Sequence, residues 1–163
     1  MASFGAFFGG TGSTKPGPGG PTSLVGSQAA SYEVKRLDGA ADALDRYRGQ
    51  IVVANLWASW CAPCREETPA LAQLYREERG KGVVVLGIDQ GESAEAAGSF
   101  AREQKLDYPI LLDEDQRYGR AFGSVGLPTT VFVDRTGRVA EGVDGPLTLE
   151  QMRAKLAPLL AAR

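Results

Sequence analysis

The two cysteines of this chain lie two residues apart, in the segment Trp60-Cys61-Ala62-Pro63-Cys64. Residues 51–57, just before them, form an apolar run that predicts a buried strand, and residues 65–79 after them have helical character. A thiol pair between a strand and a helix is typical of a protein whose two sulfurs close a small ring on oxidation and reopen it on reduction. The motif therefore constrains the fold to an α/β arrangement around a dithiol.

Composition excludes several classes of protein. The 163 residues suffice for one domain with a proper core, and 18 basic against 20 acidic side chains give a net charge of -2. This balance gives no electrostatic reason to expect nucleic acid as a partner. The absence of histidine excludes Ser-His and Cys-His hydrolases. We expect no metal, because one cysteine pair cannot supply four zinc ligands, and no cofactor, because no phosphate-binding glycine loop occurs.

The first 30 residues differ from the rest of the chain. Residues 1–30 are rich in Gly, Pro, Ser and Thr, and predict a flexible tail or linker, either native or added. No apolar run reaches the roughly 18 residues of a membrane span, and the first ten residues lack the regions of a secretory signal. A cytoplasmic location therefore stays open beside an extracytoplasmic one, whose signal or anchor would be absent from this chain.

Residues 31–163 alternate between strand and helix patterns, which predicts one α/β domain. A capping box of Thr148 and Gln151 marks the start of the last helix, and residues 134–137 predict the turn of a β-hairpin. The remaining expectations are strands at 32–37, 51–57, 83–88, 108–112, 129–133 and 138–141, and helices at 40–47, 62–79, 93–105 and 115–122.

The two cysteines occupy different positions relative to the predicted helix. Cys61 precedes its N-terminus, where free N–H groups and the positive end of the dipole favour a thiolate and lower the pKa of the thiol. Cys64 lies a turn further in, so we expect it to be less exposed and to act as the resolving thiol. Pro63 fits the first turn, where its missing N–H costs nothing.

Residues 56–65, Leu-Trp-Ala-Ser-Trp-Cys-Ala-Pro-Cys-Arg, resemble the active-site segment of the thioredoxin superfamily, and most of all that of the TlpA/ResA-type thiol-disulfide oxidoreductases. Pro69 matches the helix-kinking proline of thioredoxins, and residues 126–130, Gly-Leu-Pro-Thr-Thr, resemble the loop whose proline is cis and faces the dithiol. The resemblance covers residues 31–163. It implies a thioredoxin fold: a central mixed β-sheet flanked by helices, with an N-terminal strand/helix extension and a central helix–strand insert.

The resemblance also implies roles for individual residues. Cys61 and Cys64 would form the redox-active disulfide, and the backbone at Leu127, before the cis proline, would pair with an extended substrate segment. The residues implied to contact the substrate are Trp60, Pro63, Leu127, Pro128 and Thr129.

Two positions place the chain within the superfamily. Thioredoxins carry a buried Asp before the motif as a proton acceptor for the resolving thiol, and here that position is Asn55, which cannot ionise. Glu67, three residues past Cys64 on the same helical face, resembles the carboxylate of TlpA/ResA-type proteins. Our hypothesis is that Glu67 assists deprotonation of Cys64. A solvated acidic residue, as we expect of Glu66, is the open alternative.

The resemblance implies an enzyme that exchanges disulfides with protein substrates. Members of the branch reduce apocytochrome c cysteines before haem attachment or serve copper-centre assembly, take electrons from a membrane thiol reductant, and act outside the cytoplasm; we expect a monomer. The sequence alone does not set the redox direction. Two alternatives are a non-catalytic interaction module that docks partners at the Pro128 groove, and a peroxiredoxin-like antioxidant. The chain lacks the Pro-x-x-x-Thr-x-x-Cys setting of peroxiredoxins.

Overall fold

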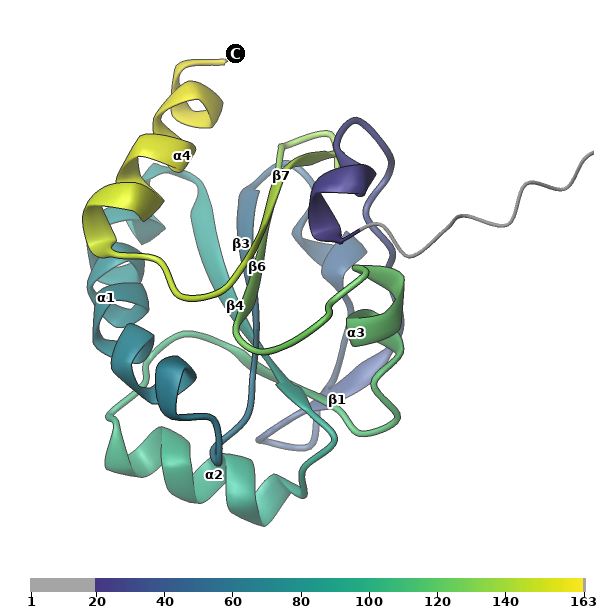
Figure 1. Ribbon diagram of the computed structural model, residues 1–163, viewed down its shortest axis with the longest axis vertical. Coiled ribbons are helices and arrows are strands. Elements are labelled where there is room, and N and C mark those ends of the chain that lie inside the picture. The colour runs from purple at the N-terminus through teal and green to yellow at the C-terminus, as the bar shows by residue number, and fades with distance from the viewer. Residues whose placement is uncertain (1–19, 163) are drawn as a thin grey trace, which may run out of the picture.

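A mixed sheet with helices on both faces organises residues 20–162, the part of the chain that the computed structural model describes (Figure 1). The sheet order is β2-β1-β5-β4-β3-β6-β7. The strands are β1 (Val34–Arg36), β2 (Ala41–Asp42), β3 (Ile51–Trp57), β4 (Val83–Gln90), β5 (Ile110–Asp113), β6 (Thr129–Val133) and β7 (Val139–Asp144). The helices are α1 (Ala62–Glu78), α2 (Ala94–Glu103), α3 (Arg117–Ala121) and α4 (Leu149–Ala161), with 3-10 turns η1 (Pro21–Leu24), η2 (Leu44–Tyr47) and η3 (Arg79–Lys81).

The two central strands are buried on both faces. Every residue of β3 and of β4 is buried, because α1, α2 and α4 cover one side of the sheet and α3 with the N-terminal segment covers the other (Figure 1). Strands β3, β4 and β5 run parallel, whereas β6 pairs with β3 in the antiparallel direction. Continuous apolar runs such as residues 83–88 suit strands covered on both faces. The predicted thioredoxin fold with a mixed sheet is therefore confirmed.

The extension and the insert of the fold meet in the sheet. The insert between β4 and β6 consists of α2, β5 and α3, and β5 pairs on one side with β4 and on the other with β1 of the N-terminal extension. The predicted hairpin is present between β6 and β7, with Gly137 at a φ of 85° in its turn. The capping box of Thr148 and Gln151 begins α4 as predicted.

Residues 40–47 do not form the helix that their sequence predicts. They form strand β2, which pairs with β1, and the 3-10 turn η2. Asp38 and Gly39 make the turn between the strands, with Gly39 at a φ of 83°, so this dipeptide was a hairpin signal that the helical interpretation overlooked. Buried Asp42 then accepts hydrogen bonds from the Ala43 N–H and the Tyr47 hydroxyl, which holds the chain in this path.

The segment at residues 20–30 lies along β7, the last strand of the sheet. The N–H of Gly26 and the carbonyl of Ser27 bond Val139, and Thr22 Oγ1 donates to the Gly142 carbonyl. The chain is thus attached to the sheet from Pro21, earlier than the boundary at residue 31 that composition suggested, because backbone pairing does not require an apolar sequence. Residues 1–19 of the predicted tail lie outside the described residues.

Candidate active site

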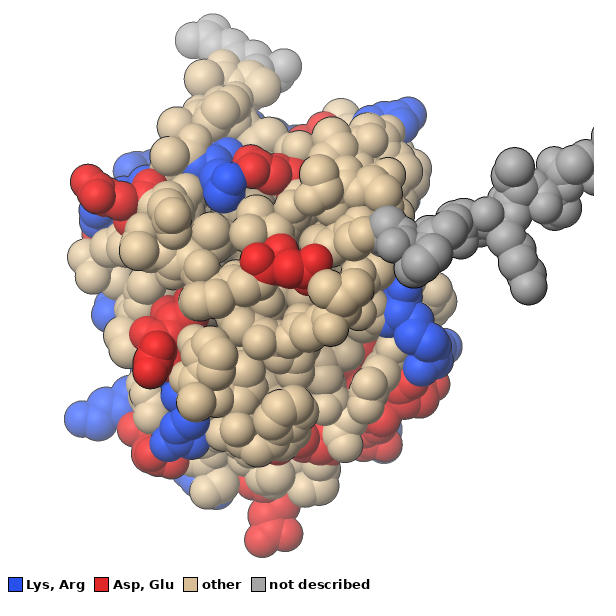
Figure 2. Space-filling view, in the orientation of Figure 1, with Lys and Arg blue, Asp and Glu red and all other residues tan. Residues whose placement is uncertain are grey.

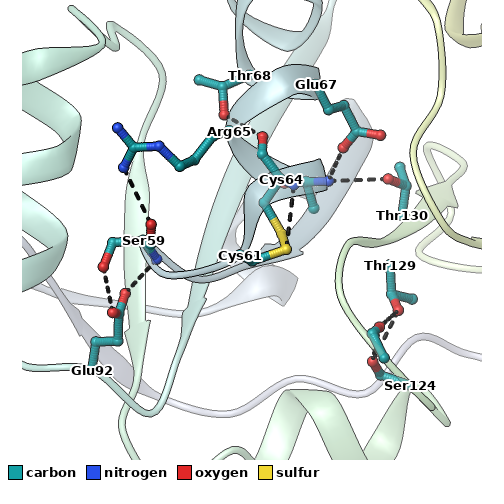
Figure 3. The surroundings of a disulfide bond; sticks show 12 residues. Ser59, Cys61, Cys64, Arg65, Glu67, Thr68, Glu92, Ser124, Thr129 and Thr130 are labelled. Atoms are coloured by element: carbon teal, nitrogen blue, oxygen red, sulfur yellow. Dashed lines mark hydrogen bonds between the residues drawn. A yellow bond between two sulfur atoms is a disulfide. The ribbon is translucent and has the colours of Figure 1, made fainter.

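The cysteine pair lies where β3 ends and α1 begins (Figure 3). Cys61 is the N-cap residue of α1, and its Sγ accepts a hydrogen bond from the Cys64 N–H at 3.3 Å. The two residues are joined by a disulfide bond across a Cα–Cα distance of 5.2 Å. Opening this bond would leave a Cys61 sulfur at the positive end of a helix with a backbone donor aimed at it, an arrangement that stabilises a thiolate.

Both cysteines are buried. Cys61 is 4% exposed and Cys64 is 2% exposed, so Cys64 is the less exposed of the two, as expected, while Cys61 presents only a small accessible area in the oxidised protein. The burial follows from packing that sequence spacing does not reveal, since both sulfurs belong to the core cluster that includes Trp57 and Leu147. The exposed neighbour is Trp60, at 72%.

Glu67 is buried beneath the dithiol helix rather than solvated. Its Oε1 accepts a hydrogen bond of 2.7 Å from Asn55 Nδ2, and its Oε2 accepts one of 2.6 Å from the Leu147 N–H. Asn55 is positioned in turn by Thr130 Oγ1 at 3.1 Å (Figure 3). Burial raises the pKa of Glu67 to about 7, and the hydrogen bonds from Leu147 and Asn55 oppose the rise. A carboxyl group with this pKa can accept and release a proton near neutrality.

The loop before β6 has the predicted cis bond, between Leu127 and Pro128. Leu127 is half-buried and lines a groove together with the Trp60 ring, exposed Val125 and Gln90. Pro63 is exposed on the first turn of α1, whereas Pro128 is buried. The structure thus brings Trp60 of the dithiol loop and Leu127 of the cis-proline loop to one groove.

Thr129 does not present its side chain at this groove. It is fully buried, and its Oγ1 donates to the Gly126 carbonyl at 2.7 Å and lies 2.9 Å from both Asp144 Oδ1 and Ser124 Oγ (Figure 3). The expected contact of this side chain with substrate is therefore wrong, because the hydroxyl is used to hold the loop in shape.

A second polar cluster lies on the other side of the dithiol loop, and sequence reasoning missed it. The Glu92 carboxylate accepts hydrogen bonds from the Ser59 N–H at 2.8 Å and the Ser59 hydroxyl at 2.6 Å (Figure 3). Arg65 donates to the Ser59 carbonyl at 3.2 Å. One indirect signal of this cluster was present in the sequence, because Asp89 is a polar residue at the end of an apolar run. In the structure Asp89 lies in the buried part of β4 and accepts a hydrogen bond from the Glu92 N–H.

Within residues 20–162 no three or more His, Cys, Asp or Glu side chains gather as a metal ion would require. In the same range, no helix combines the length and the apolar character needed to cross a bilayer.

Comparison with known proteins gives a consistent result. The sequence profile of the AhpC/TSA family matches residues 25–141. Thiol-disulfide oxidoreductase ResA of Geobacillus thermodenitrificans is 34% identical over 132 residues, 81% of this chain and 76% of that protein. Thiol:disulfide interchange protein HelX of Rhodobacter capsulatus is 35% identical over 144 residues, 86% of this chain and 80% of that protein. The crystal structure of a secreted thiol-disulfide isomerase from Corynebacterium glutamicum superposes with a TM-score of 0.75 at 28% identity, covering 83% of this chain and 86% of that one.

Proposed function

Because the chain belongs to the AhpC/TSA family and is a thioredoxin-fold thiol-disulfide oxidoreductase related to ResA, we propose that its Cys61–Cys64 pair reduces disulfide bonds in protein substrates. The observation that carries the proposal is the position of the pair: the Cys61 sulfur caps helix α1 and is bonded to Cys64 within the same turn. A sulfur in that position is a good nucleophile once reduced, and its partner is near enough to displace the product.

In the reduced protein, the Cys61 thiolate attacks one sulfur of the substrate disulfide. An S–S bond forms between Cys61 and the substrate, and the second substrate sulfur leaves as a thiolate that takes a proton from solvent. The Cys64 N–H, which bonds Cys61 Sγ, favours the thiolate that starts this step.

In the second step, Cys64 attacks Cys61 Sγ and breaks the mixed disulfide. Glu67 accepts the Cys64 proton in our proposal, since its pKa of about 7 leaves it partly ionised at neutral pH. The substrate sulfur leaves as a thiolate and takes a proton from solvent, so the substrate now has two thiols and the protein has the Cys61–Cys64 disulfide that the structure contains. Two electrons have passed from the cysteine pair to the substrate.

In this proposal the substrate segment lies along the groove between Trp60 and Leu127, and it also contacts Pro63 and Pro128. The backbone of Leu127 pairs with the segment as an added strand would. Figure 2 shows one face of the molecule, on which uncharged surface predominates around an acidic patch near the centre. The lining of the groove supports a protein partner, because it includes Trp60, Val125 and Leu127 and a single charged residue, Arg120, so that binding would bury apolar area without desolvating many charges.

The finer role is also a proposal. Following the TlpA/ResA-type resemblance, we propose apocytochrome c as the substrate, or a copper-centre protein, and a membrane thiol protein as the source of electrons. We propose that the protein acts outside the cytoplasm, as a monomer. The similarity to a protein described as secreted supports the compartment, since disulfide substrates persist in oxidising compartments.

The test uses a peptide with a C-x-x-C-H haem-attachment motif in its disulfide form. We expect the reduced full chain to open the peptide disulfide, and we expect Cys64→Ser to accumulate a mixed disulfide between Cys61 and the peptide, seen by mass spectrometry. Cys61→Ser should lack both activities.

Insulin reduction in the presence of dithiothreitol separates the enzyme from a binding module. The module predicts equal rates for the wild type and Cys61→Ser, and such equality would refute the proposed function. Reduction of insulin without preference for the haem-motif peptide would leave the oxidoreductase and remove the apocytochrome assignment.

A further inference from the structure

Glu92 is bound to the dithiol loop by two hydrogen bonds. Its two carboxylate oxygens accept hydrogen bonds from the N–H and the hydroxyl of Ser59, which lies 33 residues before Glu92 in the sequence. Ser59 in turn precedes Cys61 by two residues. Arg65 bonds the Ser59 carbonyl from the other side. Every polar group of Ser59 is thus engaged, so the path of the chain into Trp60 and Cys61 is set by these contacts.

Asp89 lies behind Glu92 in the core. It is completely buried in β4, with Oδ1 bonded to the Glu92 N–H at 3.1 Å and Oδ2 without a partner. The Glu92 carboxylate is near enough to Asp89 for its negative charge to disfavour the ionised form of Asp89. Asp89 is buried whereas Glu92 is partly exposed, so the cost of ionising both falls mainly on Asp89, whose carboxylate would lose its hydration and face a like charge. A proton on Asp89 removes the repulsion between the two carboxylates and lets Asp89 Oδ2, which has no partner, act as a hydrogen-bond donor.

Given the function proposed above, we propose that Glu92 is a positioning residue of this active site, which fixes the Ser59–Cys61 segment and is itself held in place by a proton shared with Asp89. Glu92 does not touch the sulfurs. It acts through Ser59, and the Asp89 proton lets it remain an ionised acceptor.

The proton makes the arrangement dependent on pH. Burial, followed by the hydrogen bond with Glu92 and the charge of Glu92, raises the pKa of Asp89 to about 8. Burial raises the pKa of Glu92 too, but the bonds with Asp89 and Ser59 outweigh this effect and leave it below its usual value. Below pH 8 Asp89 is protonated and the Ser59 contacts are intact. Above pH 8 two adjacent carboxylates repel each other, and Glu92 withdraws from Ser59.

Other charges near the pair come from three elements. Asp113 of β5 adds a like charge that raises the pKa of Asp89 further. Arg65 of α1 reaches the Ser59 carbonyl, and Glu103 of α2 pairs with Arg65 at 2.8 Å. In the oxidised protein the two cysteines are in a disulfide and do not titrate, so the oxidised state isolates the carboxyl pair from the thiols.

The direct test follows the Ser59 amide in the oxidised, nitrogen-15-labelled full chain by NMR between pH 6 and 9.5. We expect its proton resonance to titrate with a midpoint of about 8 and its hydrogen exchange to exceed the intrinsic base-catalysed increase above that pH. In Asp89→Asn the side-chain amide donates to Glu92 at every pH, so this titration should vanish while the Ser59 bond remains. In Glu92→Gln the Ser59 resonance should differ from wild type at every pH.

Two results would overturn the proposal: a Ser59 resonance in Glu92→Gln equal to that of the wild type, or a titration that persists in Asp89→Asn. A serine variant provides a further check, because Ser59→Thr keeps the hydroxyl that Ser59→Ala removes. Thiol reactivity of the reduced protein should fall in the alanine variant and recover in the threonine variant; equal values in both would contradict a positioning role.

Activity gives an independent readout. Loss of the charged acceptor should lower kcat/KM for insulin reduction about tenfold in Glu92→Gln, the loss expected for a hydrogen bond to a charged group. The control, Glu95→Gln, changes an exposed carboxylate three residues later and should match the wild type. Wild-type activity in Glu92→Gln, together with an inactive Cys61→Ser, would refute the positioning role of Glu92 and leave the proposed function standing. Activity retained in Cys61→Ser would sink the proposed function and leave the NMR result standing.

Discussion

At the scale of single residues, Glu67 and Asn55 act together. Asn55 cannot ionise, yet its amide donates a hydrogen bond of 2.7 Å to the Glu67 carboxylate. The amide on β3, at the position where thioredoxins have an Asp, therefore positions the carboxyl group on α1. The second bond, from the Leu147 N–H, ties the carboxylate to the chain before α4. Burial outweighs both bonds, and the pKa of Glu67 rises to about 7. Glu67, the proton acceptor that we propose, thus lies on the same helix as Cys64.

This raised pKa predicts how stability depends on pH. Between pH 4.5 and about 7 the folded wild type holds a proton that the unfolded chain has lost. Stabilisation by protonated Glu67 is therefore complete below pH 4.5 and disappears as pH rises through the folded pKa, a loss of roughly 3 kcal/mol. Glu67→Gln lacks this loss. Urea unfolding of the oxidised proteins should show the variant gaining relative to wild type from pH 4.5 to 8.

A matched control is Glu66→Gln, since Glu66 is exposed on the same helical turn. Because water solvates this side chain, its replacement should change the unfolding free energy by less than about 0.5 kcal/mol. A difference between Glu67→Gln and the wild type that does not change with pH would contradict the raised pKa of Glu67.

Sequence could predict some of these residues and not others. The Cys61–Cys64 pair and Glu67 lie within one short segment, where helical spacing limits their geometry. Glu92 could not be found this way, because its partner Ser59 lies 33 residues away and only the pairing of β3 with β4 brings them together. The extent to which Cys61 is buried could not be predicted for a similar reason: the side chains that bury it come from distant segments.

At the scale of elements, the cis-proline loop depends on Thr129. Its hydroxyl contacts the Gly126 carbonyl and Ser124 within the loop, and Asp144 at the end of β7. A loop that joins a short helix to a strand is thereby fixed to the neighbouring strand. The hydroxyl has a structural task that an exposed contact with substrate could not fulfil.

Replacing Thr129 by Val keeps the shape of the side chain and removes the hydroxyl. Because the hydroxyl loses its bonds with Asp144 and the Gly126 carbonyl, and both exposed partners can bond water instead, we expect a loss of about 0.5–1.5 kcal/mol in unfolding free energy. Insulin reduction should also slow, as the loop shifts against Trp60. Urea unfolding checks the first effect, and Ser99→Ala, which removes an exposed hydroxyl, is the control. Unchanged stability in Thr129→Val would refute the assigned task.

Elements with a strong local signal were predicted well, and those formed by pairing were not. The capping box of α4 and the β6–β7 hairpin are determined by residues close in sequence. Residues 40–47 were predicted wrongly because their structure depends on contacts outside the segment. Strand β2 forms by pairing with β1, and the buried Asp42 side chain holds the turn that follows.

At the scale of the whole molecule, the sheet has one protected edge that matters for solubility. The described segment at residues 20–30 bonds the outer side of β7 and covers backbone groups that could otherwise pair with another chain. The close approach requires glycine at position 142. A Cβ there would lie 2.6 Å from Pro21, which real Cβ atoms essentially never do.

We expect Gly142→Ala to push this segment away from β7. Stability should fall by about 1–3 kcal/mol, as in other overpacked sites, and limited proteolysis should cut within residues 20–30 before the rest of the domain. Light scattering should detect association at high concentration through the uncovered strand. Gly80→Ala is the matched control, because no atom lies within 4 Å of a Cβ there. Equal protease resistance of the two variants would contradict the packing.

Strand β3 lies in the interior of the sheet, between β4 and β6, with all seven of its residues buried. The cysteines therefore follow directly on a strand that is buried along its whole length, while Glu92, Leu127 and Leu147 come from separate turns before α2, β6 and α4. The sequence of each of these turns could change separately without altering the central strands of the sheet. An engineer could accordingly retune redox potential or partner choice by grafting turns, leaving the central strands untouched.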